Sequence, residues 1–142
     1  MSKYLGPRLR KLRTLGLPLP RFRNKGSNPP GQHGGKRRGK KSLYGLQLQE
    51  KQKIMFIYGW RDKQVKNEYI KAKAKAGDTV VNLLISSESR LDNLIFRSGL
   101  VNTIDFAREW VSHGHFLVNG KKVKTPSYKV EPGQKISLKK EI

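Results

Sequence analysis

The chain has 142 residues, enough for one domain or for a domain with an appendage. Its 31 Lys and Arg residues against 10 Asp and Glu residues give a formal net charge of +21, which attracts polyanions and makes nucleic acid the first candidate partner. The sequence has no cysteine, which excludes disulfides, thiolate metal sites and cysteine catalysis. No membrane partner is expected, because there is no long apolar run and no basic helix with a broad apolar face.

Residues 1–42 form a strongly basic block. It holds 13 of the 31 Lys and Arg residues and no Asp or Glu. Prolines at positions 18, 20, 29 and 30, together with seven glycines, argue against a long helix, and apolar residues are too few for a core. A disordered solubilising tail would mix both signs of charge, so we interpret the block as an arm that folds along RNA and is mobile without it. Residues 36–41 (KRRGKK) also fit a nuclear localisation signal, a weak pattern that phosphate contact explains equally well.

Residues 43–87 are expected to form a small helical body. Capping residues and glycines divide this segment into three short helices, which start at Ser42, at Asp62 and at Asp78 or Thr79. Apolar residues recur at helical spacing within each of them. The segment therefore predicts a small body of short helices.

Three aromatic side chains bear on the role of this body. Phe96 points away from Leu91 on its own predicted helix, so we expect the helical body to bury it. Tyr58 and Trp60 are typical of a core, although such a pair could also serve as a stacking platform for RNA bases. The sequence leaves both interpretations of the pair open.

The segment 88–142 predicts two helices followed by a small sheet. Ser89 with Asp92 three residues later is a capping pattern, and Gly99 can end the first helix in a left-handed conformation. Thr103 is a good N-cap for the second helix, which carries apolar residues on one face.

Turn signals place the strands of this sheet. Asn119-Gly120 is a strong hairpin signal and predicts a type I′ turn. Residues 131–134 (EPGQ) fit a type II turn, and Ile136 and Leu138 alternate with polar residues as in a half-buried final strand. The expected fold class is therefore α+β, with two helices packed on a small antiparallel sheet.

Basic residues recur along this unit. Arg90 and Arg97 are seven residues apart, so two helical turns would bring them to one side of the first helix. Further cations lie on the second helix and after the hairpin turn: Arg108, Lys121, Lys122 and Lys124. A helix pair and a hairpin with basic residues along one shared edge would suit binding to a phosphate backbone, although each charge could also be an ordinary solvated one. Asp92 lies beside Arg90 and is expected to be structural rather than catalytic.

Two sets of motifs resemble known families. RLDNLIFRSGL, followed by the spacing T-x-x-x-A-R-x-x-V-x-H-G-H and by LVNGKKV, resembles the S-four (S4) RNA-binding domain. PGQHG at 30–34 and YGLQLQEKQK at 44–53 resemble the family of the small-subunit ribosomal protein S-four, as do GPR at 6–8 and R-x-x-G at 13–16. The resemblance covers most of the chain.

This resemblance implies a structural constituent of the small ribosomal subunit. Such a protein would bind small-subunit rRNA directly, nucleate assembly and support translation and its accuracy. Implied partners are the rRNA, neighbouring ribosomal proteins such as S-five, and mRNA near the entry channel. The domains would be a basic arm (1–42), a helical body (43–87) and an S4 RNA-binding domain (88–142).

The sequence departs from the family pattern at two places. Ser86 and Ser87 stand where relatives usually have two leucines. Relatives usually continue for some dozens of residues past the last strand, and that returning segment packs on the helical body. If that segment is absent here, the surface on which it would pack could have become polar, which would explain the two serines. A short form of this kind, rich in lysine, favours a plastid ribosome over a mitochondrial or bacterial one.

Two rival functions are weighed. An S4 domain joined to an enzyme would need a catalytic domain, for which no residues remain, and no paired carboxylates, nucleophile elbow or phosphate-binding loop is present. His113 and His115 have no third metal ligand, so neither a metal nor a cofactor is expected. A free ribosome-associated S4 factor would not need the PGQHG and LQLQEKQK segments, so it remains the alternative.

The residues expected to contact RNA are mostly basic and lie in the arm and in the S4 unit. They are Arg8, Arg10, Lys11, Arg13, Arg21, Arg23, His33, Lys36, Arg37, Arg38, Lys40, Lys41, Arg90, Arg97, Thr103, Arg108, His113, Lys121, Lys122 and Lys124.

Overall fold

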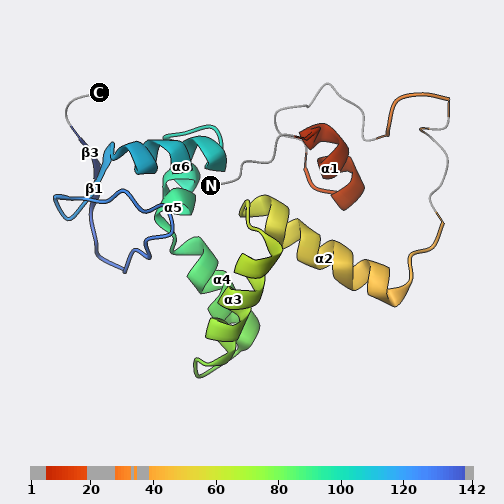
Figure 1. Ribbon diagram of the computed structural model, residues 1–142, viewed down its shortest axis with the longest axis horizontal. Coiled ribbons are helices and arrows are strands. Elements are labelled where there is room, and N and C mark those ends of the chain that lie inside the picture. The colour runs from red at the N-terminus through yellow and green to blue at the C-terminus, as the bar shows by residue number, and fades with distance from the viewer. Residues whose placement is uncertain (1–5, 19–27, 33, 35–38, 140–142) are drawn as a thin grey trace. The chain divides into compact units, whose positions relative to one another are not determined.

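The chain forms two compact units, Met1–Ile57 and Tyr58–Ile142 (Figure 1). The computed structural model describes residues 6–18, 28–32, 34 and 39–139. The three-part division that composition suggests, with boundaries after residues 42 and 87, stays a prediction. Among the described residues, no helix combines the length and the apolar character that crossing a bilayer requires.

The first unit begins with α1 (Arg8–Leu15), a helix inside the basic arm. Gly16 ends it in the left-handed region at φ 67°, and the Gly16 N–H donates to the Arg13 carbonyl. Composition argued only against a long helix here, and α1 spans eight residues. Leu15 is 2% exposed, and the Gln49 side chain donates to the Leu15 carbonyl at 3.2 Å. This contact joins α1 to the next helix.

The second helix of this unit, α2 (Leu43–Ile57), is capped as predicted. The Gly45 N–H donates to Ser42 Oγ at 3.2 Å, which satisfies an amide at the helix start. No residue of α2 is buried, and large apolar side chains on it are 37–74% exposed: Leu43, Tyr44, Leu46, Leu48 and Ile57. A helix with this much exposed apolar surface gains stability when a partner covers it.

The second unit opens with α3 (Asp62–Lys73). The prediction that Asp62 caps this helix is wrong. The N-cap is Arg61, whose backbone N–H donates to Gln64 Oε1 at 2.9 Å, and Asp62 is the first helical residue. There its carboxylate lies in the first turn and interacts favourably with the positive end of the helix dipole.

Helix α4 (Thr79–Glu88) packs against α3. Asp78 is its N-cap, as predicted, and its carboxylate accepts a backbone N–H of the first turn at 2.7 Å. Leu83 faces inward, and the Ser87 hydroxyl donates to the Leu83 carbonyl at 2.6 Å. The buried serine is thereby satisfied within its own helix.

Helix α5 (Leu91–Arg97) follows after a short break. The predicted cap at Ser89 is wrong, because Ser89 is the C-cap of α4 and Arg90 is the N-cap of α5. The argument that two helical turns place Arg90 beside Arg97 therefore fails, since Arg90 precedes the helix. Gly99, at φ 79°, follows the end of α5 as predicted.

Helix α6 (Ile104–His113) matches its prediction at both ends and along its inner face. The Thr103 hydroxyl accepts a first-turn N–H at 3.2 Å. Gly114 ends the helix at φ 80°. Ala107 and Val111 on the predicted apolar face are completely buried.

The three strands β1 (Phe116–Val118), β2 (Lys121–Lys122) and β3 (Ile136–Leu138) form an antiparallel sheet in the order β2-β1-β3. Asn119 and Gly120 connect β1 to β2 at φ 48° and 77°. Positive φ at both positions is the signature of a type I′ turn and confirms the hairpin prediction.

The turn before β3 is also as predicted, but one strand residue is not. The Gln134 N–H donates to the Glu131 carbonyl at 3.2 Å, and Gly133 has φ 88°, as a type II turn requires. Ile136 packs against the core. Leu138, expected to be half-buried on the same face, is 41% exposed.

The core of the second unit lies between α5, α6 and the sheet. Its buried side chains are Leu91, Ile95, Val101, Ala107, Val111, Phe116 and Val118. Fully burying a large apolar side chain of this kind contributes roughly 1.5–3 kcal/mol. Phe96 is partly buried and packs against this cluster, and its burial by the helical body stays a prediction.

Tyr58 and Trp60 stand at the start of the second unit as buried aromatics. Their exposed fractions are 6% and 5%, and their ring centroids are 5.4 Å apart. Rings this deeply buried offer no free face to a nucleobase. The core interpretation is confirmed, and the stacking platform expected as its alternative is not formed by this pair.

Candidate nucleic-acid interface

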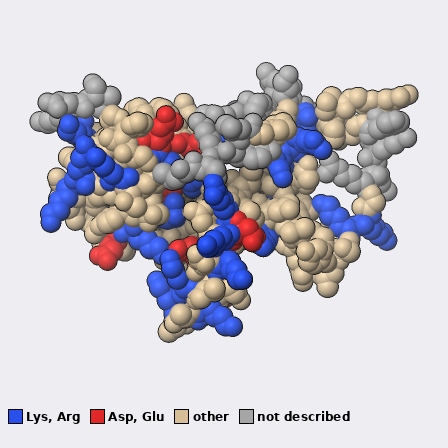
Figure 2. Space-filling model, viewed as in Figure 1, with Lys and Arg blue, Asp and Glu red and all other residues tan. Residues whose placement is uncertain are grey.

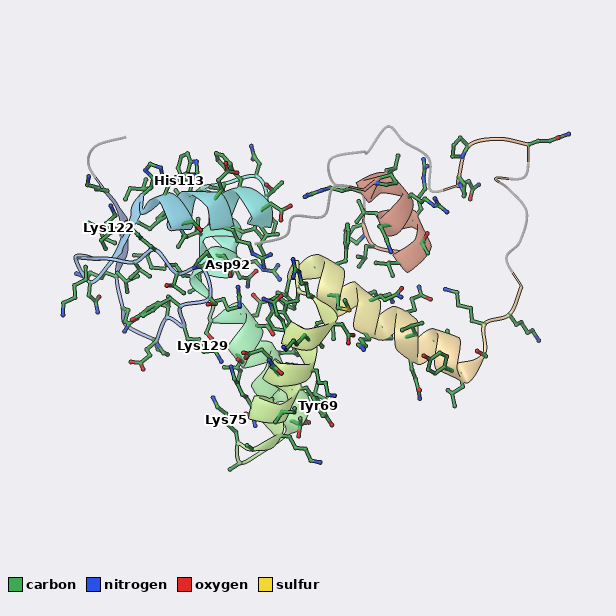
Figure 3. The ribbon with its side chains drawn as sticks, in the orientation of Figure 1. Tyr69, Lys75, Asp92, His113, Lys122 and Lys129 are labelled. Atoms are coloured by element: carbon green, nitrogen blue, oxygen red, sulfur yellow. The ribbon has the colours of Figure 1, made fainter. Side chains whose placement is uncertain are left out.

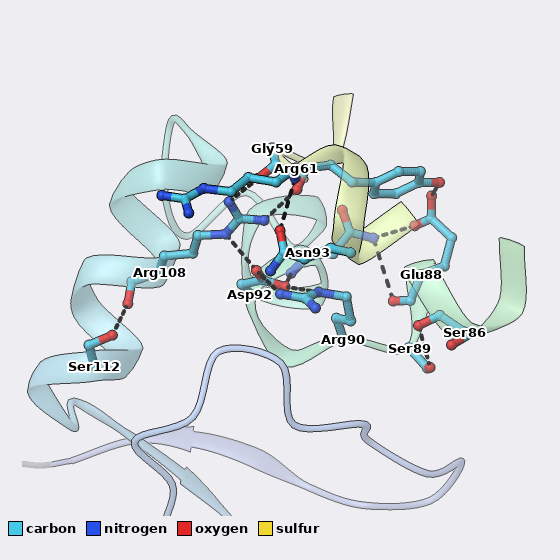
Figure 4. Close-up of polar contacts among 12 residues, drawn as sticks. Gly59, Arg61, Ser86, Glu88, Ser89, Arg90, Asp92, Asn93, Arg108 and Ser112 are labelled. Atoms are coloured by element: carbon cyan, nitrogen blue, oxygen red, sulfur yellow. Dashed lines mark hydrogen bonds and ion pairs between the residues drawn. The ribbon is translucent and has the colours of Figure 1, made fainter. Parts of the chain in front are cut away.

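A buried carboxylate organises the second unit (Figure 4). Asp92 is 0% exposed and binds two arginines. Arg90 donates to both carboxylate oxygens, from Nε at 3.0 Å and from a terminal nitrogen at 2.8 Å, and the Arg108 Nε donates at 2.8 Å. The Asn93 N–H adds a bond at 2.9 Å. The carboxylate is thus fully paired, which is what burial of a charge requires, and the structural role expected for Asp92 is confirmed.

The same two arginines connect elements that are distant in sequence. Arg108 donates to the carbonyl oxygens of Tyr58 and Gly59, the latter at 2.8 Å. Arg90 lies over the ring of Trp60, 5.7 Å from its centroid. Their side chains are only 12% and 13% exposed. Both guanidinium groups hold the fold, and direct RNA contact by them stays a prediction.

Arg97 occupies a more open position at the end of α5. Its guanidinium is 58% exposed and binds Glu88 Oε1 at 2.9 Å. The Tyr58 hydroxyl donates to the same carboxylate at 2.7 Å. Burial and this bond to Glu88 raise the pKa of Tyr58 to about 12. Burial tends to raise the pKa of Glu88, but bonds from Tyr58, Arg97 and Asn93 outweigh it and lower that pKa.

A second polar cluster joins the α3–α4 pair to the loop that follows β2. The Ser86 hydroxyl donates to Glu68 Oε2 at 2.8 Å, and Lys129 binds both groups, the carboxylate at 3.2 Å. Burial tends to raise the pKa of Glu68, but hydrogen bonds from Lys71, Ser86 and Lys129 lower it to about 2. Ser86, one of the two departures from the family pattern, is therefore used in a specific interaction.

Exposed cations collect around the β1–β2 hairpin (Figure 2). We define the hairpin lysines as Lys121, Lys122 and Lys124, all exposed. The side chain of Lys122 lies so close over Gly114 that a Cβ there would overlap its Cε. Its ammonium group thus stands at the C-terminus of α6, the negative end of the helix dipole. Of the three hairpin lysines, Lys122 is therefore the one placed against the end of the helix.

The expected residues of the arm are only partly described. Arg10 and Lys11 are exposed on α1, while Arg8 and Arg13 are half-buried on the same helix. Lys40 and Lys41 are exposed before α2, and Lys41 also binds Gln49. The remaining expected residues lie outside the described part: Arg21, Arg23, His33, Lys36, Arg37 and Arg38.

The two remaining expected residues lie at opposite ends of α6. Thr103 uses its hydroxyl as the N-cap, and His113 is exposed in the last turn. Among the described residues, no group of three or more His, Asp or Glu side chains is placed to hold a metal ion. Exposed cations on a well-packed frame are suited to binding phosphate groups.

Sequence reasoning missed two features of this surface. Lys129 was not singled out, because its partners Glu68 and Ser86 are 61 and 43 residues away. The exposed ring of Phe106 and the partly buried ring of Trp110 on α6 were also overlooked. Their spacing of four residues was the available signal.

Two family models together match residues 3–136. Residues 3–88 match the model described as the ribosomal protein S4/S9 N-terminal domain, and residues 89–136 match the S4 domain. The helix pair packed on a hairpin, with its exposed cations, accords with the second match. Fold and matches together define the class, an S4-domain protein with an S4/S9-type N-terminal domain.

Curated relatives narrow the class. Small ribosomal subunit protein uS4 of Brevibacillus brevis is 48% identical over 98% of this chain and 71% of the relative. Small ribosomal subunit protein uS4 of Streptococcus uberis is 48% identical over 98% of the chain and 70% of the relative, and that of Latilactobacillus sakei is 47% identical over similar shares. The chain belongs to the uS4 family of ribosomal proteins. These relatives are bacterial, and they give no support to the plastid location that the sequence favoured.

Proposed function

We propose that this protein is a structural constituent of the small ribosomal subunit and binds small-subunit rRNA directly. The observation that carries the proposal is the match to uS4 proteins along 98% of the chain at 48% identity. The exposed hairpin lysines supply the chemistry, because ammonium groups neutralise phosphates and release counterions. The role is structural rather than catalytic, in keeping with the ribosomal relatives.

The two units contribute differently to binding. The S4 unit is held by the fully paired Asp92 and by its apolar core, so its cations project from a well-packed frame, which suits recognition of RNA shape. The first unit keeps the apolar surface of α2 exposed and carries the basic helix α1. When RNA or neighbouring proteins cover this unit, the apolar side chains of α2 become buried and the cations of α1 are neutralised.

Finer roles follow from the family resemblance. The protein nucleates assembly of the subunit and contributes to the accuracy of translation. Its neighbours in the subunit include ribosomal protein S-five, and it lies close to the mRNA entry channel. The bacterial relatives support the coarser part of this proposal, because they are proteins of the small ribosomal subunit.

A free ribosome-associated S4 factor is the less favoured function. Such a factor would need the S4 domain but not the N-terminal domain that matches residues 3–88. The two functions differ in how firmly the protein is held. A structural constituent remains with small subunits through a high-salt wash, whereas a loose factor is released.

The test combines that high-salt wash with replacement of lysines by uncharged Gln. Changing the three hairpin lysines to Gln should weaken binding to a small-subunit rRNA transcript and lower the slope of log affinity against log salt by up to about three. Lys66, Lys73 and Lys75, exposed on and after α3, provide a matched control with the same charge change. Equal losses for the two triple variants would mean that only total charge matters. Release of the unaltered protein by high salt would favour the loose factor.

A further inference from the structure

Helix α6 carries a row of rings on its outer face. Phe106, Trp110 and His113 follow one another at spacings of four and three residues, and His115 comes directly after the helix. Ring centroids are 4.9 Å apart for Phe106 and Trp110, 5.6 Å for Trp110 and His115, and 6.1 Å for the two histidines. We call these four side chains the ring row. Rings at these distances contact one another and form a continuous aromatic surface.

The ring row is anchored on one side and open on the other. Trp110 is partly buried against the core, with its ring 6.3 Å from that of the fully buried Phe116. Phe106 is 41% exposed and His113 is exposed. A fixed indole with exposed neighbours is preorganised, so little side-chain entropy is lost when a flat ligand stacks on it. Tyr58 and Trp60, in contrast, are buried and cannot do this.

Charge gives the row a direction. Its C-terminal end has Lys122 lying over Gly114, together with His113 (Figure 3). Its N-terminal half has Asp105 and the exposed Glu109 on the same helix. An anionic group is therefore attracted to the C-terminal end and repelled from the other. A ligand that is anionic at one end and flat and aromatic at the other fits this arrangement.

We propose that the ring row stacks one or two unpaired RNA bases, with the adjoining phosphate at Lys122 and His113. The full positive charge of Lys122 exceeds the roughly half negative charge of the helix end that it covers, so a phosphate is still attracted there. This inference rests on the proposed RNA-binding function and specifies how part of that RNA is held. A base-paired helix hides its base faces, so the ligand is a loop, bulge or strand end. An apolar peptide would not use the cations at the end of the row, which is why RNA is favoured over a protein partner.

The test is base-resolved footprinting on a small-subunit rRNA transcript with the full chain. Trp110→Leu removes the indole face but keeps an apolar side chain against the core. We expect one or two unpaired bases to lose protection and the affinity to fall on the order of tenfold, the scale of one lost stacking contact. The salt slope should stay unchanged, because stacking releases no counterions. Trp110→Phe, which keeps a ring, should restore most of the affinity.

Further variants separate stacking from folding. If Trp110→Leu lowers the melting temperature, Phe106→Leu replaces it as the test, because Phe106 is a more exposed member of the row. Phe106→Leu should give a smaller loss of protection and affinity at the same bases. With Trp60→Phe, Trp110 is the sole tryptophan of the chain, and its fluorescence should be quenched by the rRNA transcript but not by a fully paired RNA duplex.

Three results would overturn the inference. An unaltered footprint and affinity for both leucine variants would overturn it while leaving the proposed function in place. Normal rRNA binding combined with lost association with other subunit proteins would show that the row faces protein. Absence of rRNA binding by the unaltered protein would instead overturn the proposed function, and the inference with it.

Discussion

Replacing Asp92 by Asn is expected to destabilise the S4 unit severely. The two side chains have nearly the same shape, so the change removes the charge and part of the acceptor capacity and leaves no cavity. Arg90 and Arg108, which are 12% and 13% exposed, would remain largely buried without their counter-charge. Removing one member of a buried ion pair costs about 3–5 kcal/mol, a large part of the roughly 5–15 kcal/mol by which a whole domain is stable.

The loss is measured as a shift in the urea midpoint, followed by tryptophan fluorescence, and as a melting temperature from circular dichroism. A cost of this size should lower the melting temperature by more than about 10 °C. Glu109→Gln makes the same chemical change at an exposed position of α6 and should alter stability by less than about 0.5 kcal/mol. Combining Asp92→Asn with Arg90→Met should cost less than the sum of the two single changes, because the second removes a charge that the first leaves unpaired.

Equal stability of Asp92→Asn and the unaltered protein would refute the reasoning. It would mean that the two arginines are hydrated or re-paired at little cost. Strict additivity of the double variant would likewise show that Arg90 and Asp92 do not interact energetically.

Three further expectations concern other parts of the chain. The pKa of Glu68 is lowered in the folded protein from 4.5 to about 2, so its contribution to stability is complete above pH 4.5 and is lost as the pH falls towards 2. Glu68→Gln should therefore flatten the decline of stability in acid, and an unchanged profile would exclude this carboxylate as its source. Gly120→Val should cost on the order of 1–3 kcal/mol in urea unfolding because φ is 77° there, although no atom lies within 4 Å of the added Cβ; normal melting would contradict the turn assignment. Deleting residues 1–42 should leave the second unit folded while reducing rRNA affinity and its salt slope, and an unchanged slope would mean that the arm does not touch RNA.

The sequence by itself determined the local elements of the S4 unit. The Thr103 cap, the helix ends at Gly99 and Gly114, and the type I′ turn at Asn119-Gly120 all form as predicted. Each depends on backbone preferences and hydrogen bonds within a few residues, and these are legible in a short stretch of sequence. The family resemblance was equally legible, because it depends on motifs rather than on packing.

The tertiary structure alone decided which charged and aromatic side chains are free to act. Arg108 appears in the sequence as one more cation on a helix edge, but it binds the carbonyl of Gly59, 49 residues away, as well as Asp92. The burial of Trp60 and the partial exposure of Trp110 depend in the same way on long-range packing. The free energy of burying a charge or a ring depends on neighbours that only the folded chain brings together, so no local pattern could separate the arginines that hold the fold from the lysines that stay exposed.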